Sequence, residues 1–124
     1  ELFGRYPDGL NSHEHVHFFP SFVSPIITLA HEFGVTYVRF GTRGMLLSLH
    51  HSAIGHILNQ LARTNHRRFA KAGLATSTYL VSLDWVHGKE RFFHALEKLS
   101  EEETVELVVH PERDREFDFI QRHL

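Results

Sequence analysis

The apolar residues of this chain occur in two patterns, as short continuous runs and at a spacing of three or four residues. The two patterns alternate along the chain and predict alternating strands and helices. Runs rich in β-branched and aromatic residues predict strands near residues 10–14, 35–39, 76–82 and 105–109. Apolar residues three or four positions apart predict helices over residues 20–34, 52–73, 89–99 and 115–124. Such alternation favours βαβ units around a parallel sheet, so we expect an α/β fold.

Single residues mark where these helices should begin and end. Pro20 stands at a helix start, a position that tolerates a missing N–H, and Ser52 has the side chain of an N-cap. Gly34 and Gly73 stand where the first two helical patterns stop. Glycine takes left-handed backbone without a steric penalty, so we expect both to end helices.

Composition narrows the class of protein. A length of 124 residues with 42% hydrophobic residues fits one domain or a partial domain over residues 1–124. The absence of Cys excludes disulfides, thiolate metal sites and Cys nucleophiles. A net charge of −2 without a basic stripe argues against nucleic acid as a partner. No apolar run is long enough to span a bilayer, so we expect no membrane partner and a cytoplasmic location. The chain starts at Glu1 rather than Met, which leaves a leader open.

Three of the twelve histidines, His13, His15 and His17, stand at alternate positions. On an extended strand, alternate side chains leave the backbone on the same face. Imidazole is the commonest metal ligand and titrates near neutral pH, so this pattern predicts a His-lined pocket. A surface strand that happens to be rich in His is the alternative. We interpret His17 as packing near the following helix start and capping it.

The other predicted strands also end in polar residues. These are Arg39 with Arg43, then Asp84 with His87, and finally His110. In parallel α/β folds, ligands bind at the carboxyl ends of the strands, so we expect these side chains to share one rim with His13. Asp84 and His87 are equally compatible with an ordinary loop. Trp85 is compatible with stacking on a sugar ring or with core packing.

Residues 11–20, Asn-Ser-His-Glu-His-Val-His-Phe-Phe-Pro, resemble the signature of the YdjC-like carbohydrate deacetylases. That family includes the chitooligosaccharide deacetylases. Residues 4–7, Gly-Arg-Tyr-Pro, resemble the lead of the signature, and residues 29–39 and 106–111 resemble two later blocks in the same order. The resemblance covers nearly the whole chain.

The resemblance implies that this chain is part of a (β/α) barrel of deacetylase type. It matches the middle and C-terminal part of the family's domain. The Asp-Asp pair and the further metal-binding His that the family carries upstream are not in this sequence, and Glu112 replaces a usual Gly. We therefore expect the intact protein to be active and this segment alone to be inactive.

The resemblance also implies metal-dependent hydrolysis of the N-acetyl group of an amino sugar or chito-oligosaccharide. A divalent ion polarises the carbonyl and lowers the pKa of a bound water. Magnesium or zinc is expected, although His and carboxylate ligands also accept Mn, Co or Ni. The matched positions assign His13 and His15 to the metal and His110 and Arg39 to catalysis. We add Asp84 and Trp85 as candidates for substrate binding.

A different class of function stays open. The chain could be a catalytically incomplete sugar-binding or assembly module derived from the same fold. A half-barrel exposes apolar edges that need covering, which leaves a homo-oligomer or association with another chain open.

Overall fold

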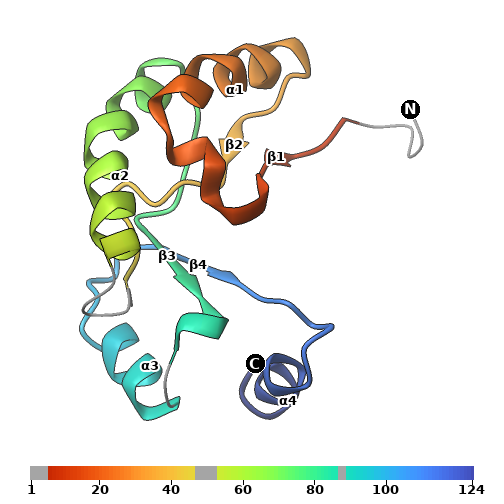
Figure 1. The fold of residues 1–124 in the computed structure, drawn as a ribbon, viewed down its shortest axis with the longest axis vertical. Helices are drawn as coiled ribbons and strands as arrows, with labels where there is room; N and C mark the ends of the chain where they lie inside the picture. The colour runs from red at the N-terminus through yellow and green to blue at the C-terminus, as the bar shows by residue number, and fades with distance from the viewer. Residues whose placement is uncertain (1–5, 47–52, 87–88) are drawn as a thin grey trace.

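The computed structural model describes residues 6–46, 53–86 and 89–124 (Figure 1). Its first half runs through β1 (Gly9–Leu10), the 3₁₀ turn η1 (His13–Phe18), α1 (Pro20–Glu32), β2 (Tyr37–Val38) and α2 (Ala53–Lys71). Its second half runs through β3 (Tyr79–Ser82), the 3₁₀ turn η2 (Leu83–Trp85), α3 (Lys89–Leu96), β4 (Val105–Val108) and α4 (Asp114–His123).

The strands form two parallel pairs, β1 with β2 and β3 with β4. A helix crosses over between the strands of each pair, so each pair is a βαβ unit, as the apolar pattern predicts. Parallel bridges from Tyr37 to Ala75 and from Met45 to Leu80 connect the two units. The fold is therefore mixed α/β with parallel pairing. The described strands do not close into a barrel, and the barrel stays an expectation for the intact protein.

The prediction of a strand over residues 10–14 was largely wrong. Strand β1 ends at Leu10, and the three alternate histidines lie in the 3₁₀ turn that follows. The hydroxyl of Ser12 accepts a hydrogen bond from the backbone N–H of His17 at 3.2 Å, which draws the chain into a turn. Side chains at alternate positions of a tight turn do not share one face, so the argument from strand periodicity fails here.

The helix boundaries follow the predicted signals closely. Pro20 is the first residue of α1, and Gly34 and Gly73 have φ of 65° and 74°, left-handed backbone that glycine takes without strain. Ser52, the expected cap of the second helix, lies outside the described residues. The last two helices agree with the expected spans within a few residues at each end.

The core lies where α1 and α2 cover the strands (Figure 1). Its centre is a row of buried rings: Phe18 lies 4.4 Å from Phe40, and Phe40 lies 4.8 Å from Phe69, between ring centroids. Burying one such ring stabilises the fold by roughly 1.5–3 kcal/mol. Because Phe18 is the last residue of η1, this packing also fixes the histidine turn against the sheet.

No helix in the described part of the chain is both long enough and apolar enough to cross a bilayer.

Candidate functional site

A cavity of about 850 Å³ opens where β2, β3 and β4 end. Its polar wall includes every residue that the sequence nominated for a metal, catalytic or substrate role: His13, His15, Arg39, Asp84, Trp85 and His110. Arg39 directly follows β2, and Asp84 and His110 each come two residues after the end of β3 and β4. Parallel strands present their carboxyl ends at one edge, which explains how residues far apart in sequence meet here.

The apolar wall of the cavity was not foreseen. It consists of Phe19, Ile54, Ile57 and Leu58, from the start of α1 and the first turns of α2. The helical spacing places Ile54 on the core side of its helix, yet its side chain is 62% exposed. Ile54 borders the cavity instead, so the apolar stripe of α2 serves both the core and the cavity.

His15 combines an unusual backbone conformation with a buried ring nitrogen that has no hydrogen-bond partner in the described part of the chain. Its φ is 59°, the left-handed region that non-glycine residues rarely take. The side chain is 8% exposed, and its Nδ1 has no hydrogen-bond partner among the described residues. Burial and the nearby Arg39 charge lower the pKa of His15. Buried polar atoms are normally paired, so a strained residue with an unpaired ring nitrogen indicates a binding role.

His17, two residues further on, is a structural residue. It is 1% exposed, and its Nε2–H donates to the carbonyl oxygen of Arg39, which fixes the tautomer because a carbonyl can only accept. Its Nδ1 then accepts from the hydroxyl of Ser12. Burial lowers the pKa of His17 to about 4. The predicted packing near the helix start is present, but the start of α1 has no side-chain cap.

Arg39 is buried, and its Nη2 donates to the carbonyl oxygen of Ser12 at 2.9 Å. Its Nε is buried without a hydrogen-bond partner among the described residues. Burial lowers the pKa of Arg39, while the carboxylate of Glu106 opposes that shift. The guanidinium therefore keeps an unused donor next to the cavity it lines.

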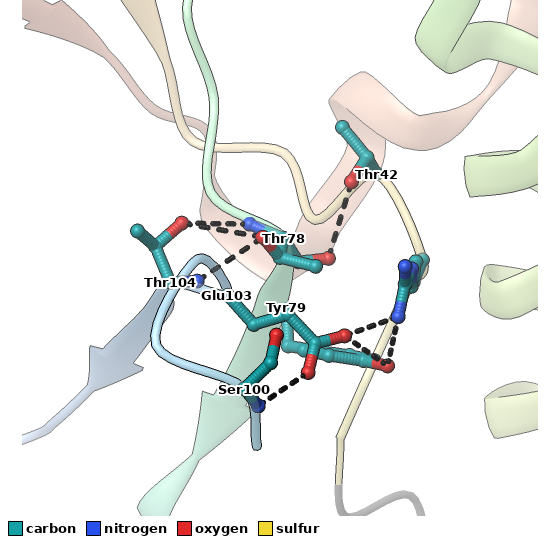
Figure 2. A network of polar contacts seen from close by, with 7 residues as sticks. Thr42, Thr78, Tyr79, Ser100, Glu103 and Thr104 are labelled. Atoms are coloured by element: carbon teal, nitrogen blue, oxygen red, sulfur yellow. Dashed lines mark hydrogen bonds and ion pairs between the residues drawn. The ribbon is translucent and has the colours of Figure 1, made fainter.

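Arg43, named with Arg39 at the same strand end, lies elsewhere. Its Nη1 donates to the carboxylate of Glu103 and, at 3.2 Å, to the hydroxyl of Tyr79. Figure 2 shows the network around these residues, in which Thr104 also binds Thr78. Arg43 does not line the cavity, so its contacts join the loop after β2 to the β3–β4 unit.

A chain of polar contacts joins three residues that line the cavity, Asp84, Arg113 and His110, through the buried Glu116. Arg113 Nη1 donates to Asp84 Oδ2 at 3.1 Å and to Glu116 Oε1 at 3.2 Å. Glu116 Oε2 lies 3.3 Å from His110 Nδ1. Burial opposes ionisation of Asp84, but hydrogen bonds from Ser82 and Arg113 prevail and hold the pKa of that carboxyl below its usual value. Sequence reasoning missed Arg113 and Glu116. Their signal is the placement of Glu116 as the third residue of a helix that follows a short turn.

Trp85 packs partly against the core and partly faces the cavity. Its ring meets the ring of His15 edge to face, with centroids 6.0 Å apart. The interpretation as core packing therefore holds for part of this side chain, and stacking on a sugar ring stays a prediction for the part that lines the cavity. His13 is exposed at the start of η1 and lines the same cavity, and His87 lies outside the described residues.

The donor set for a metal is incomplete in the described part of the chain. Residues 6–46, 53–86 and 89–124 contain no group of three His, Asp or Glu side chains that converge on one point. The unpaired Nδ1 of His15 fits a ligand role, and His13 is on the same wall. A stable zinc or magnesium site needs further oxygen or nitrogen donors.

A parallel α/β fold with histidines, an arginine and carboxylates at its strand ends is the architecture of a small-molecule site. The model of the YdjC-like protein family matches residues 1–123, so the chain belongs to that family. No curated protein and no solved structure matches the chain. Membership supports a function related to carbohydrate deacetylation.

Proposed function

We propose that the intact protein removes N-acetyl groups from amino sugars or chito-oligosaccharides by metal-dependent hydrolysis in this cavity. The supporting observation is that His13, His15, Arg39 and His110 line one cavity at the carboxyl ends of the strands. Family membership gives the reaction class. A volume of about 850 Å³ is in the range of small-molecule pockets and leaves room for more than one sugar ring.

His13 and His15 are the proposed metal ligands on this chain. When bound, a divalent ion such as zinc or magnesium polarises the amide carbonyl and lowers the pKa of a water ligand. The Nδ1 of His15 is buried and has no hydrogen-bond partner among the described residues. Binding a metal through this nitrogen would therefore break no existing hydrogen bond and would remove little water from the ring. The remaining donors and the general base are proposed to come from the Asp pair that the family resemblance places upstream of this segment.

The other residues of the cavity act on the substrate directly. Water oxygen bonds to the acetyl carbon, the C–N bond breaks, and the products are acetate and a free amine. The proposed upstream carboxylate takes a proton from the attacking water, and His110, as the imidazolium, gives a proton to the leaving nitrogen. Arg39, which lines the cavity, donates a hydrogen bond to an oxygen of the substrate. Trp85 stacks on a sugar ring, and Asp84 accepts a hydrogen bond from a sugar hydroxyl.

The test is acetate release from N-acetylated chito-oligosaccharides by the full-length protein, with and without a chelator. Chelator and His13→Ala should each abolish release. His56→Ala is the matched control, because His56 is an exposed histidine on α2 that does not line the cavity. Release that withstands both the chelator and His13→Ala would contradict the metal mechanism. Sugar binding without turnover by a form that carries the upstream Asp pair would favour the non-catalytic module.

A further inference from the structure

Glu116 is a buried carboxylate whose two oxygens are both engaged. Its side chain is 4% exposed. Oε2 accepts the backbone N–H of His110 at 2.7 Å and lies 3.3 Å from His110 Nδ1. Oε1 accepts Arg113 Nη1 at 3.2 Å. A buried carboxylate is costly unless it is paired and hydrogen-bonded, and the contacts with Arg113 and His110 meet that requirement.

The chain between these residues leaves Glu116 little freedom. After β4, the carbonyl oxygen of His110 accepts the N–H of Arg113 at 2.9 Å, which closes a turn. The carbonyl oxygen of Arg113 accepts the N–H of Glu116 at 3.0 Å, which starts α4. A turn followed at once by a helix start brings the third helical residue back over the end of the strand.

This contact determines which nitrogen of His110 faces a ligand. A carboxylate can only accept, so Nδ1 carries the hydrogen that Glu116 receives. Nε2 is then the nitrogen available to a substrate in the cavity that His110 lines. Without such a partner, an imidazole can exchange tautomers and rotate.

Arg113 ties this pair to the neighbouring strand end. Its Nη1 also donates to Asp84 Oδ2 at 3.1 Å, and the hydroxyl of Ser82 donates to Asp84 Oδ1. Asp84 and Arg113 line the cavity beside His110. Contacts through Arg113 and Asp84 therefore connect the carboxylate of Glu116 to the end of β3, in addition to its own helix.

We propose that Glu116 is a positioning residue for His110: it holds the Nδ1–H side of the ring, so that Nε2 faces the substrate and, once Nε2 has taken up a proton to form the imidazolium, delivers that proton to the leaving amine. The catalytic part of this proposal rests on the proposed deacetylation. The tautomer part does not, because it concerns only the contact between two residues of this chain. Partners that orient metal-bound histidines typically contribute about 10–100-fold to activity or metal affinity, and we expect an effect of similar size for a histidine that donates a proton.

The first experiment needs no activity. In the full-length protein with ¹⁵N-labelled histidine, the ring nitrogens of His110 are assigned by comparison with His110→Gln and measured at a pH where the imidazole is neutral. The expected result is a protonated Nδ1 and an unprotonated Nε2. A neutral ring protonated at Nε2 would overturn the proposal, because that tautomer has no Nδ1–H to donate to Glu116.

The second experiment compares two changes of carboxylate to amide on the same helix. Glu116→Gln should lower kcat for acetate release by about 10–100-fold and leave KM within about twofold. Asp118→Asn should leave both unchanged, since Asp118 is exposed and pairs only with Arg122 among the described residues. Equal kcat in these two variants, with the wild type active, would overturn the positioning role. If the wild type releases no acetate, that result counts against the proposed function. The tautomer measurement would still show whether Glu116 accepts the Nδ1–H of His110.

Discussion

His15 and His17 lie two residues apart in the same 3₁₀ turn, and their rings are in opposite situations. Both ring nitrogens of His17 are hydrogen-bonded, its backbone is ordinary, and burial lowers its pKa to about 4. His15 has left-handed backbone, a buried Nδ1 that has no partner in the described part of the chain, and a side chain that lines a cavity. Burial alone therefore does not separate a structural histidine such as His17 from a candidate ligand such as His15. The separation comes from whether its nitrogens already have partners.

The largest expected effect is on stability, and it should fall on His17. His17→Ala removes a fully buried ring and leaves the hydroxyl of Ser12 and the carbonyl of Arg39 without their partner. We expect it to lower the free energy of unfolding by about 3–5 kcal/mol in urea titrations. His15→Ala should cost less, about 1.5–3 kcal/mol, because it removes a buried ring that packs on Phe18 and Trp85 but whose Nδ1 has no hydrogen-bond partner among the described residues. Equal losses in the two variants would contradict the assignment.

The next effect is the pH dependence of stability. The unfolded chain takes up a proton on His17 below its ordinary pKa of about 6.5, whereas the folded chain resists protonation down to about 4. The stabilisation is complete above the unfolded value and is lost as pH falls toward the folded value. Between pH 7 and pH 5 the wild type should lose about 2 kcal/mol from this residue. His17→Gln should remove that part of the pH dependence in paired urea titrations, and parallel curves would argue against a buried neutral ring.

The smallest effect distinguishes the two arginines that follow β2. The side chain of Arg43 is 62% exposed and pairs with Glu103, and neither residue lines the cavity. Arg43→Ala should cost less than about 1 kcal/mol in urea titrations, as exposed ion pairs usually do. It should leave acetate release unchanged, whereas a clear loss of turnover would place Arg43 in the site.

The sequence predicts the βαβ order, the parallel pairing and the helix ends, because apolar periodicity, Pro20, Gly34 and Gly73 act locally. It does not predict the end of β1, since the hydrogen bond from His17 to Ser12 competes with strand geometry. His13 and His15 still line one cavity with the other predicted site residues, although no strand holds them, because both residues follow soon after the end of β1.

Sequence patterns mark Glu116 only as an early residue of the last helix and do not report its contact with His110. Its importance depends on the turn between His110 and Arg113 and on burial, neither of which composition or spacing reports. Ile54 shows the same limit from the apolar side, because helical spacing cannot tell a core position from a cavity wall. Tertiary contacts decide both cases.

The most direct test of the account is acetate release by His15→Ala and His17→Gln in the full-length protein, each corrected for its folded fraction. The account predicts that His15→Ala loses at least about 100-fold in turnover while its fold is kept. His17→Gln should stay within about tenfold of the wild type per folded molecule, although it is less stable. Wild-type turnover by His15→Ala, or equal losses by the two variants, would contradict the division between a functional and a structural histidine.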